Sequence, residues 1–362
     1  MPVSRILILP FLLTCLRGWT ASIPDDSVRT DGPFRIRGAI DAYISLNAAT
    51  RQQQKDPYLV SSFRQNSPSV NLAWMEFKWS NERVRATVTP AFGDYMSANY
   101  ASEHDLARNL LEANAGFRMS EKNNWWLEAG IFSSPYTNET PISQDHSMYL
   151  RSLAPEMVPY YLTGMRLSGN FSKSVSAALW LLNGWQQIRD RNNKWAFSTG
   201  LTWRLKSNLT LNHTFFLGDE RNHLLPEMRT RFLSDMYLSW QPNPTIKATA
   251  CFDVGHQQLA FGKGRTWWQV NAIVEKFISG PASIAFRTEY FHDPEGAAVT
   301  MYDVGPRFKV FGFGSCLNLK FSKNLLVRLE GRYLGGSEAI FQAGSQLNTN
   351  EVVFATNVTC MF

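Results

Sequence analysis

Along most of this chain, apolar and polar residues alternate one by one rather than at the spacing of a helix. In residues 34–45 the even positions are apolar or small, whereas the odd positions include Arg35, Arg37 and Asp41. A helix would place these three polar side chains on different sides, so a period of two indicates a strand with one apolar and one polar face. The same alternation predicts strands in other segments, including 83–92, 111–119, 197–205 and 325–333.

The connections between the predicted strands alternate between short and long. The short ones are rich in the residue types that form tight turns, and they lie at 80–82, 120–123, 172–173, 207, 243–244, 279–281 and 322–324. The long ones are polar and lie at 48–69, 96–109, 134–159, 219–231, 294–306 and 335–350. Short periplasmic turns alternating with long extracellular loops are typical of all-β transmembrane barrels. The count predicts about 16 antiparallel strands, enough for an aqueous lumen.

The N-terminus has the three parts of a secretory signal. Arg5 supplies a positive charge, residues 6–16 are mainly apolar, and small residues precede Ser22. The apolar run is shorter than the roughly 20 residues that a spanning helix needs. We therefore expect a cleaved signal peptide at 1–21, an N-terminal periplasmic segment at 22–33 and a single barrel at 34–362.

Composition favours a membrane barrel over a soluble protein or a helical membrane protein. The chain is 44% hydrophobic and 13% aromatic, yet its mean hydropathy is −0.24. No apolar stretch after Leu16 approaches the length of a membrane helix, and lipid offers the backbone no hydrogen-bond partners, which leaves a closed barrel. Aromatic rings prefer the membrane interface, and five stand where a predicted strand meets a short turn: Trp79, Trp203, Trp240, Phe277 and Phe321.

Charge and cysteine content exclude several other classes. The net charge of +6 is mild and dispersed, so nucleic-acid binding is not predicted. Once Cys15 leaves with the signal peptide, Cys251, Cys316 and Cys360 remain, an odd number that indicates no disulfide framework. The chain has no CxxC pair and no histidine-rich spacing, so we expect neither a metal nor another cofactor.

Several segments resemble a known family. An alternating final segment that ends on Phe362 is similar to the C-terminal signature read by the assembly machinery of outer-membrane barrels. Three more segments resemble the β-barrel porin-2 (OmpL-like) family: WLEAGIFSSPYTNETPIS at 126–143, PYYLTGMRLS at 159–168 and LNGWQ at 182–186. The resemblance covers about 34–362 and implies a porin of the Gram-negative outer membrane. Its implied partners are outer-membrane lipid, the barrel assembly machinery and small hydrophilic solutes, with the oligomeric state left open.

Pattern and resemblance together predict a passive channel for small hydrophilic solutes, with two alternatives. One is a plugged or narrow barrel whose long loops act as a surface binding or adhesin module. The other is an outer-membrane lipid hydrolase, for which His213 is the candidate because it stands among apolar neighbours on an outward face. The residue two positions along is Phe215 rather than serine, so no nucleophile lies beside His213 and we expect no enzyme activity.

The alternation also assigns charged side chains to the lumen. The predicted pore-lining residues are Arg35, Arg37, Arg83, Arg85, Arg118, Arg166, Arg204, Arg287, Arg328, Glu330 and Arg332. The carboxylates on the same inner face are Asp41, Glu76, Glu112, Glu128, Asp235, Asp253, Glu275, Glu289 and Glu330. Salt screens charges beyond about 8–10 Å, so we expect only a mild preference for anions. A strong preference would need a constriction formed by a folded-in loop.

Overall fold

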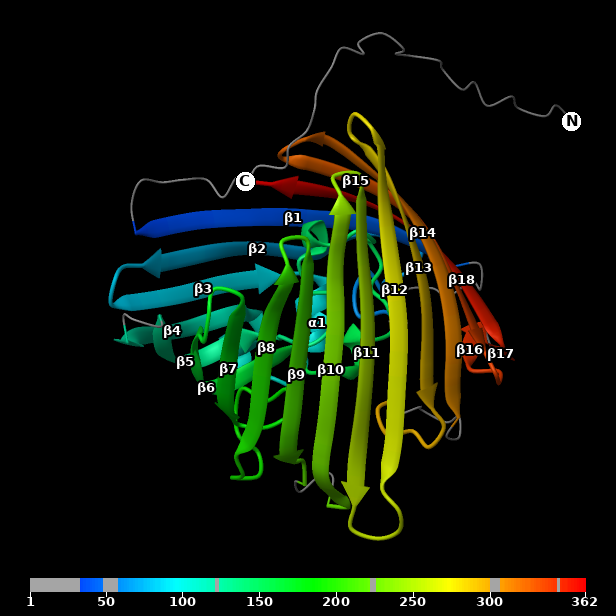
Figure 1. Ribbon diagram of the computed structural model, residues 1–362. Helices are drawn as coiled ribbons and strands as arrows, with labels where there is room; N and C mark the ends of the chain where they lie inside the picture. The colour runs from blue at the N-terminus through cyan, green and yellow to red at the C-terminus, as the bar shows by residue number, and fades with distance from the viewer. Residues whose placement is uncertain (1–32, 48–57, 121–123, 222–225, 300–306, 344–345) are drawn as a thin grey trace, which may run out of the picture.

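One antiparallel sheet closes into a barrel, as the sequence predicts (Figure 1). The computed structural model describes residues 33–47, 58–120, 124–221, 226–299, 307–343 and 346–362. The predicted signal peptide and nearly all of the predicted N-terminal segment lie outside these residues. No helix among the described residues is long and apolar enough to cross a membrane.

Sixteen of the described strands form the wall, and their order around the ring follows the chain. They are β1 (Phe34–Asn47), β2 (Pro68–Ser80), β3 (Val84–Phe92), β4 (Leu110–Ser120), β5 (Trp125–Ser133), β6 (Tyr161–Asn170), β7 (Val175–Leu182), β8 (Ala196–Lys206), β9 (Leu209–Asp219), β10 (Met228–Asn243), β11 (Ile246–Leu259), β12 (Arg265–Ser279), β13 (Ala282–Asp293), β14 (Phe308–Ser322), β15 (Leu325–Gly336) and β18 (Asn350–Met361). A separate two-stranded sheet pairs β16 (Phe341–Ala343) with β17 (Gln346–Asn348). The helical segments are α1 (Asp94–Asn99) and the 3-10 turns at Asp105–Asn109, Ser143–Asp145 and Pro155–Met157.

The ring closes where the first strand pairs with the last. β1 and β18 are antiparallel, and beyond their ladder Gly38 and Phe362 exchange two backbone hydrogen bonds of 2.9 and 3.0 Å. On the inner face, Asn71 of β2 and Asn357 of β18 both donate to the carboxylate of Asp41, at 3.0 and 2.7 Å. An open edge would leave a row of unpaired backbone groups in lipid, so this seam allows the sheet to cross a membrane.

The two faces of the wall differ in the way that the alternation predicts. Ile40, Leu329 and Phe354 point outward and are 48%, 50% and 57% exposed. Their neighbours Asp41 and Arg328 point inward and are buried. An apolar outside around a polar inside is the arrangement of a barrel whose outer surface faces lipid.

Two side chains lie on a different face from the predicted one. The pattern assigns Leu111 to the outer face, but it is buried because a register shift between β3 and β4 turns it into the interior. Phe277 is expected in the ring of aromatic residues at the interface. It pairs with the buried Ser283 and lies two residues after the inward-facing Glu275, so it belongs to the inner face. The other four predicted interface rings are exposed: Trp79, Trp203, Trp240 and Phe321.

The two ends of the barrel are built differently. The predicted short turns join neighbouring wall strands at one end, which also holds both ends of the sheet and is called the short-turn end below. The opposite end, called the long-loop end, carries the predicted long segments and two further connections at residues 183–195 and 260–264. Consecutive strands run antiparallel, so every second connection must return to the same end.

The Gly38–Phe362 contact generates a stability prediction. The Phe362 ring packs so closely over Gly38 that a Cβ placed there would lie 2.6 Å from it. Phe362→Ala removes the ring but keeps both backbone bonds, whereas deleting Phe362 removes ring and bonds together. Deletion should therefore cost about 1–3 kcal/mol more than the substitution, since each net hydrogen bond contributes about 0.5–1.5 kcal/mol.

The unfolding temperature of the purified barrel, read from heat-modifiable migration on gels, measures this difference. Phe321→Ala is the matched control, because Phe321 is an exposed aromatic residue at the same end that lies outside the seam. If both Phe362 variants and the control unfold at one temperature, the seam does not depend on the terminal residue.

Candidate functional site

The loop between β5 and β6, residues 134–160 and called the inner loop below, folds into the barrel. Met148, Tyr149 and Leu150 at its centre are fully buried. They pack in one cluster with Ile273 of β12 and Val353 of β18, on the inner face of the wall. The lumen is therefore narrowed from within by the chain itself.

Two other long-loop segments pack inside the barrel: residues 58–67, which contact the inner loop through Ser62 and Tyr149, and α1. Val60 packs against Tyr95 of α1 in a buried cluster. The Asp94 carboxylate accepts hydrogen bonds from the Tyr43 hydroxyl at 2.9 Å and from Nη2 of Arg64 at 2.9 Å. These contacts tie both segments to the wall and to each other, so the constriction is a packed structure.

Charged side chains of the wall hold the inner loop by its backbone. Glu330 Oε2 accepts the N–H groups of Tyr149 and Leu150 at 2.6 and 2.9 Å. Arg287 Nη1 donates to the Leu150 carbonyl at 2.5 Å, and the Arg328 guanidinium lies over the Tyr149 ring at 4.9 Å. Buried backbone groups need partners, and here the wall supplies them to a loop that forms no sheet of its own.

The anchoring charges also compensate one another. Arg287 pairs with Glu330 at 3.3 Å and with Glu289 at 3.2 Å, and Arg332 pairs with Glu289 at 2.8 Å. A buried charge without a partner costs several kcal/mol, so the cluster is stable only as a unit.

Four predicted pore-lining residues therefore need correction. Arg287, Arg328, Glu330 and Arg332 are 2%, 0%, 3% and 1% exposed. They face inward as the alternation predicts, but the inner loop covers them, so they anchor the constriction and do not face open water. Alternation identifies the face of a strand, but it contains no information about which distant loop packs on that face.

Other predicted pore-lining arginines remain accessible towards the short-turn end. Arg37 pairs with Glu76 at 2.7 Å, and its side chain is 51% exposed. Arg85 and Arg166 both pair with Glu128, at 2.6 and 2.8 Å, and are 26% and 25% exposed. Both carboxylates are much less accessible, at 10% and 2%. The guanidinium groups thus reach the lumen, whereas their partners are covered.

The same asymmetry extends to the remaining charges. Arg35 and Arg204 are exposed on inner-face positions, and Arg118 is half-buried 6.0 Å from the Trp126 ring. Arg83 lies in the turn between β2 and β3 rather than on a wall strand. Eight of the nine carboxylates that the alternation assigns to the inner face are buried, and Glu112 is half-buried.

Within the inner loop, His146 forms a hydrogen-bonded corner. Its Nε2 lies 2.8 Å from the Thr140 amide nitrogen, where a neutral ring accepts the N–H. Burial, followed by the positive charge of Arg151, lowers the pKa of His146 well below its ordinary value. The ring is therefore neutral at physiological pH, which matches its role as an acceptor.

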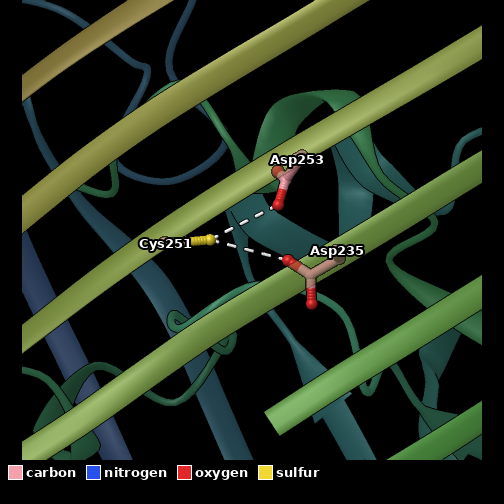
Figure 2. Close-up of side chains that lie close together, drawn as sticks. All are labelled: Asp235, Cys251 and Asp253. Carbon is pink, nitrogen blue, oxygen red and sulfur yellow. Dashed lines mark hydrogen bonds between the residues drawn. The ribbon is translucent and has the colours of Figure 1, made fainter. Parts of the chain in front are cut away.

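A cluster that the sequence analysis missed lies on the inner face of β10 and β11. Figure 2 shows Cys251 between two carboxylates, with its Sγ 3.5 Å from Asp235 and 3.4 Å from Asp253. The ligand atoms of all three lie within 4.8 Å of one another. No lysine or arginine among the described residues pairs with either aspartate. The Thr214 hydroxyl also donates to Asp235, at 3.0 Å, so hydrogen bonds from neighbouring inner-face side chains hold the cluster.

The sequence spacing of these residues could have revealed part of the cluster. Cys251 and Asp253 are two positions apart, so the alternation places them on one face. Asp235 joins them through the register of β10 with β11, in which Asp235 stands directly opposite Asp253. A register between two strands cannot be read from either strand alone.

On the lipid-facing side, His213 has a hydroxyl neighbour after all. His213 Nε2 and Ser234 Oγ lie 2.9 Å apart, with Ser234 on the adjacent strand β10. The prediction that no serine lies beside His213 is wrong, because it considered only positions along β9. A catalytic pair also needs a group that orients the histidine, and the described residues supply no second polar partner for this ring. The contact satisfies two polar side chains that would otherwise face lipid alone.

Solved structures with a similar fold are outer-membrane channels. The channel DcaP of Acinetobacter baumannii matches with a TM-score of 0.60 and 9% identity over 92% of this chain and 99% of its own. OmpT of Vibrio cholerae matches with a TM-score of 0.59 and 8% identity over 93% and 100%. The anion-selective porin of Comamonas acidovorans matches with 0.59 and 7% over 91% and 99%. At these identities the likeness shows the fold alone.

Sequence comparison identifies the family. No curated protein gives a match to this sequence. The profile of the family described as "Putative beta-barrel porin-2, OmpL-like" matches residues 33–362, which is nearly the whole chain. A closed barrel with an apolar outer face and a charged inner face agrees with that match. The chain therefore belongs to the β-barrel porin-2, OmpL-like family, and it is a porin of the bacterial outer membrane that passes small solutes by diffusion.

Proposed function

We propose that this porin is a narrow diffusion pore with a mild preference for anions, set by its short-turn half. The observation that carries the proposal is the difference in exposure between the inner-face charges. The guanidinium groups of Arg37, Arg85 and Arg166 reach the lumen, whereas Glu76 and Glu128 are covered. A permeating ion therefore meets more positive than negative charge.

The inner loop strengthens this effect by narrowing the path. Charges act over about 8–10 Å at physiological ionic strength, so an ion near the centre of a wide lumen would scarcely sense the wall. With residues 134–160 inside the barrel, ions pass closer to the exposed arginines. The Comamonas acidovorans porin is described as anion-selective, which agrees with this proposal. The proposal itself rests on the charges of this chain.

Reversal potentials in a salt gradient test the charge assignment. Wild-type protein in planar bilayers should favour chloride over potassium. Arg166→Gln leaves Arg85 to pair with Glu128 and removes the excess positive charge at that carboxylate. It should reduce the chloride-to-potassium permeability ratio, because removing a focused positive charge lowers the local anion concentration.

The control is the double substitution Arg37→Gln with Glu76→Gln, which removes one charge of each sign and should leave the ratio nearly unchanged. A wild-type preference for potassium would contradict the proposal.

The second candidate is a plugged barrel that acts as a surface binding or adhesin module. It is favoured by one observation: residues 58–67, α1 and the inner loop all pack inside the barrel. The same bilayer recordings separate the two functions. Glu330→Ala removes the acceptor of two inner-loop amides. If the wild-type protein carries no current and this variant does, the inner loop is a plug.

The inner loop should respond to acid through His146. Because the folded structure lowers the pKa of this group, the stabilisation from its neutral form is present above about pH 6.5 and is lost progressively as the pH falls below that value. Burial raises the pKa of the neighbouring Asp145, so protonation of this carboxyl stabilises the inner loop as the pH falls and opposes the effect of His146. Single-channel recordings should therefore show more current fluctuations at pH 5 than at pH 7.5.

His146→Gln keeps an acceptor at this position but does not titrate, so it isolates the histidine from Asp145. This variant should lose most of the pH dependence. If it fluctuates at pH 5 as the wild type does, His146 does not control the inner loop.

We also propose the route by which the protein reaches the membrane. Residues 1–21 would be removed on export, and the barrel assembly machinery would recognise Phe362 at the end of β18. Support comes from the N-terminal pattern and from the terminal aromatic residue on an alternating strand. In cells, Phe362→Ala should lower the yield of folded barrel by about an order of magnitude. This loss should exceed what the lower stability of the purified variant accounts for. Equal yields of the variant and the wild type would refute recognition of the ring.

A further inference from the structure

The inner wall between β5 and β10 is hollowed by a row of small side chains. Ser168, Ala178, Gly200 and Thr214 stand directly opposite one another in the register of β6 to β9. A cavity of about 370 Å³ opens over this row, and the inner loop touches it only through Pro135. This volume falls at the lower end of the range of small-molecule sites, about 300–1,000 Å³.

Aromatic rings border the cavity on both sides. Trp126 stands opposite Ser168 at one end of the row, and Tyr237 lines the other end. Trp180 lies alongside, and its ring fills the space that a Cβ on Gly200 would occupy. Trp126 and Trp180 are only 5% and 7% exposed, so they form part of the cavity floor, and the half-buried Tyr237 is the more accessible ring.

The next row towards the short-turn end supplies hydroxyl and amide groups. Ser176, Thr202 and Asn212 are consecutive partners in the register of β7, β8 and β9, and all three line the cavity. Thr202 Oγ1 donates to Asn212 Oδ1 at 2.8 Å, which leaves the Asn212 amide nitrogen available as a donor. These groups can donate to and accept from the hydroxyls of a ligand.

One charged residue faces this polar pocket. The Nε and Nη2 atoms of Arg85 bind Glu128 at 2.7 and 2.6 Å, and its guanidinium lies 4.4 Å from the Trp126 ring. Its Nη1 has no partner among the described residues, and no carboxylate lines the cavity. The pocket therefore favours one negative charge on its ligand.

We propose that this recess binds a monosaccharide-sized sugar acid: a hydroxylated ring with one carboxylate. The ring packs over Ala178 and Gly200 beside Tyr237, the hydroxyls meet Thr202 and Asn212, and the carboxylate meets Nη1 of Arg85. A mainly apolar floor with a few directed polar groups is a lining that can recognise such a ligand. This proposal rests on the anion-preferring pore proposed above, because it names a class of solute that would bind along the permeation path.

Isothermal titration calorimetry on the full-length protein in detergent tests this binding without requiring an open pore. The probe is D-glucuronate, and the comparison ligands are D-glucose and acetate. Each comparison ligand lacks one half of the interaction and should bind at least about tenfold more weakly, the factor that corresponds to 1.4 kcal/mol. Acetate that binds as tightly as glucuronate would overturn the sugar-acid assignment.

Variants separate the recess from the rest of the lumen. Ala178→Phe fills the cavity without changing charge and should abolish the binding heat. The matched control is Ser239→Phe, which adds the same bulk on the inner face of β10 at a residue outside the cavity lining and should bind as the wild type does. Equal loss in both variants would show that the lumen as a whole holds the ligand, which contradicts a defined site.

Asn212→Leu keeps the size of the side chain but removes the free amide donor. It should weaken glucuronate binding by about three- to tenfold, as expected for one net hydrogen bond, and leave heat-modifiable migration unchanged. Unchanged affinity would remove Asn212 from the site. Because binding is measured in detergent, a protein that binds glucuronate but carries no current would refute the pore while supporting the recess.

Discussion

The rest of the structure depends on one constraint: every backbone N–H and C=O that meets lipid must be paired within the wall. A sheet satisfies this constraint only if it has no free edge, so the first strand must find the last. The β1–β18 ladder and the two bonds between Gly38 and Phe362 make that closure. Once the ring is closed, the alternation of side chains divides the molecule into a lipid-facing surface and a polar interior.

A polar interior has to compensate the charges that it contains. Where the inner loop packs on it, the wall does so by binding loop backbone. Glu330 accepts two amides of the inner loop, while Arg287 bonds one of its carbonyls and pairs with Glu330. Hydrogen bonds to charged groups contribute about 1.5–3 kcal/mol each, which is enough to order an irregular segment inside the lumen. The same contacts remove these charges from the permeation path.

Arg37, Arg85 and Arg166 stay accessible towards the short-turn end, whereas the inner loop covers Arg328 near the same end. In the proposed pore, the inner loop limits the size of a solute and the accessible arginines select its charge. Arg85 also borders the β5–β10 recess. A wall row of small residues between tryptophans is what turns a uniform lumen into one with a defined hollow.

The sequence by itself determined the fold, its two faces, the short turns and the family, because a period of two and turn-forming residues are local signals that repeat along the chain. It also placed Arg85, Arg166 and Arg328 on the inner face. Tertiary structure alone decided which of them face water, since Arg328 is buried beneath the inner loop, whose Ser143 lies 185 positions away in the sequence. Register between strands likewise produces the Ser234 neighbour of His213, the Asp235–Asp253 pair beside Cys251 and the recess row. Register depends on how two strands pair, and no single strand encodes it.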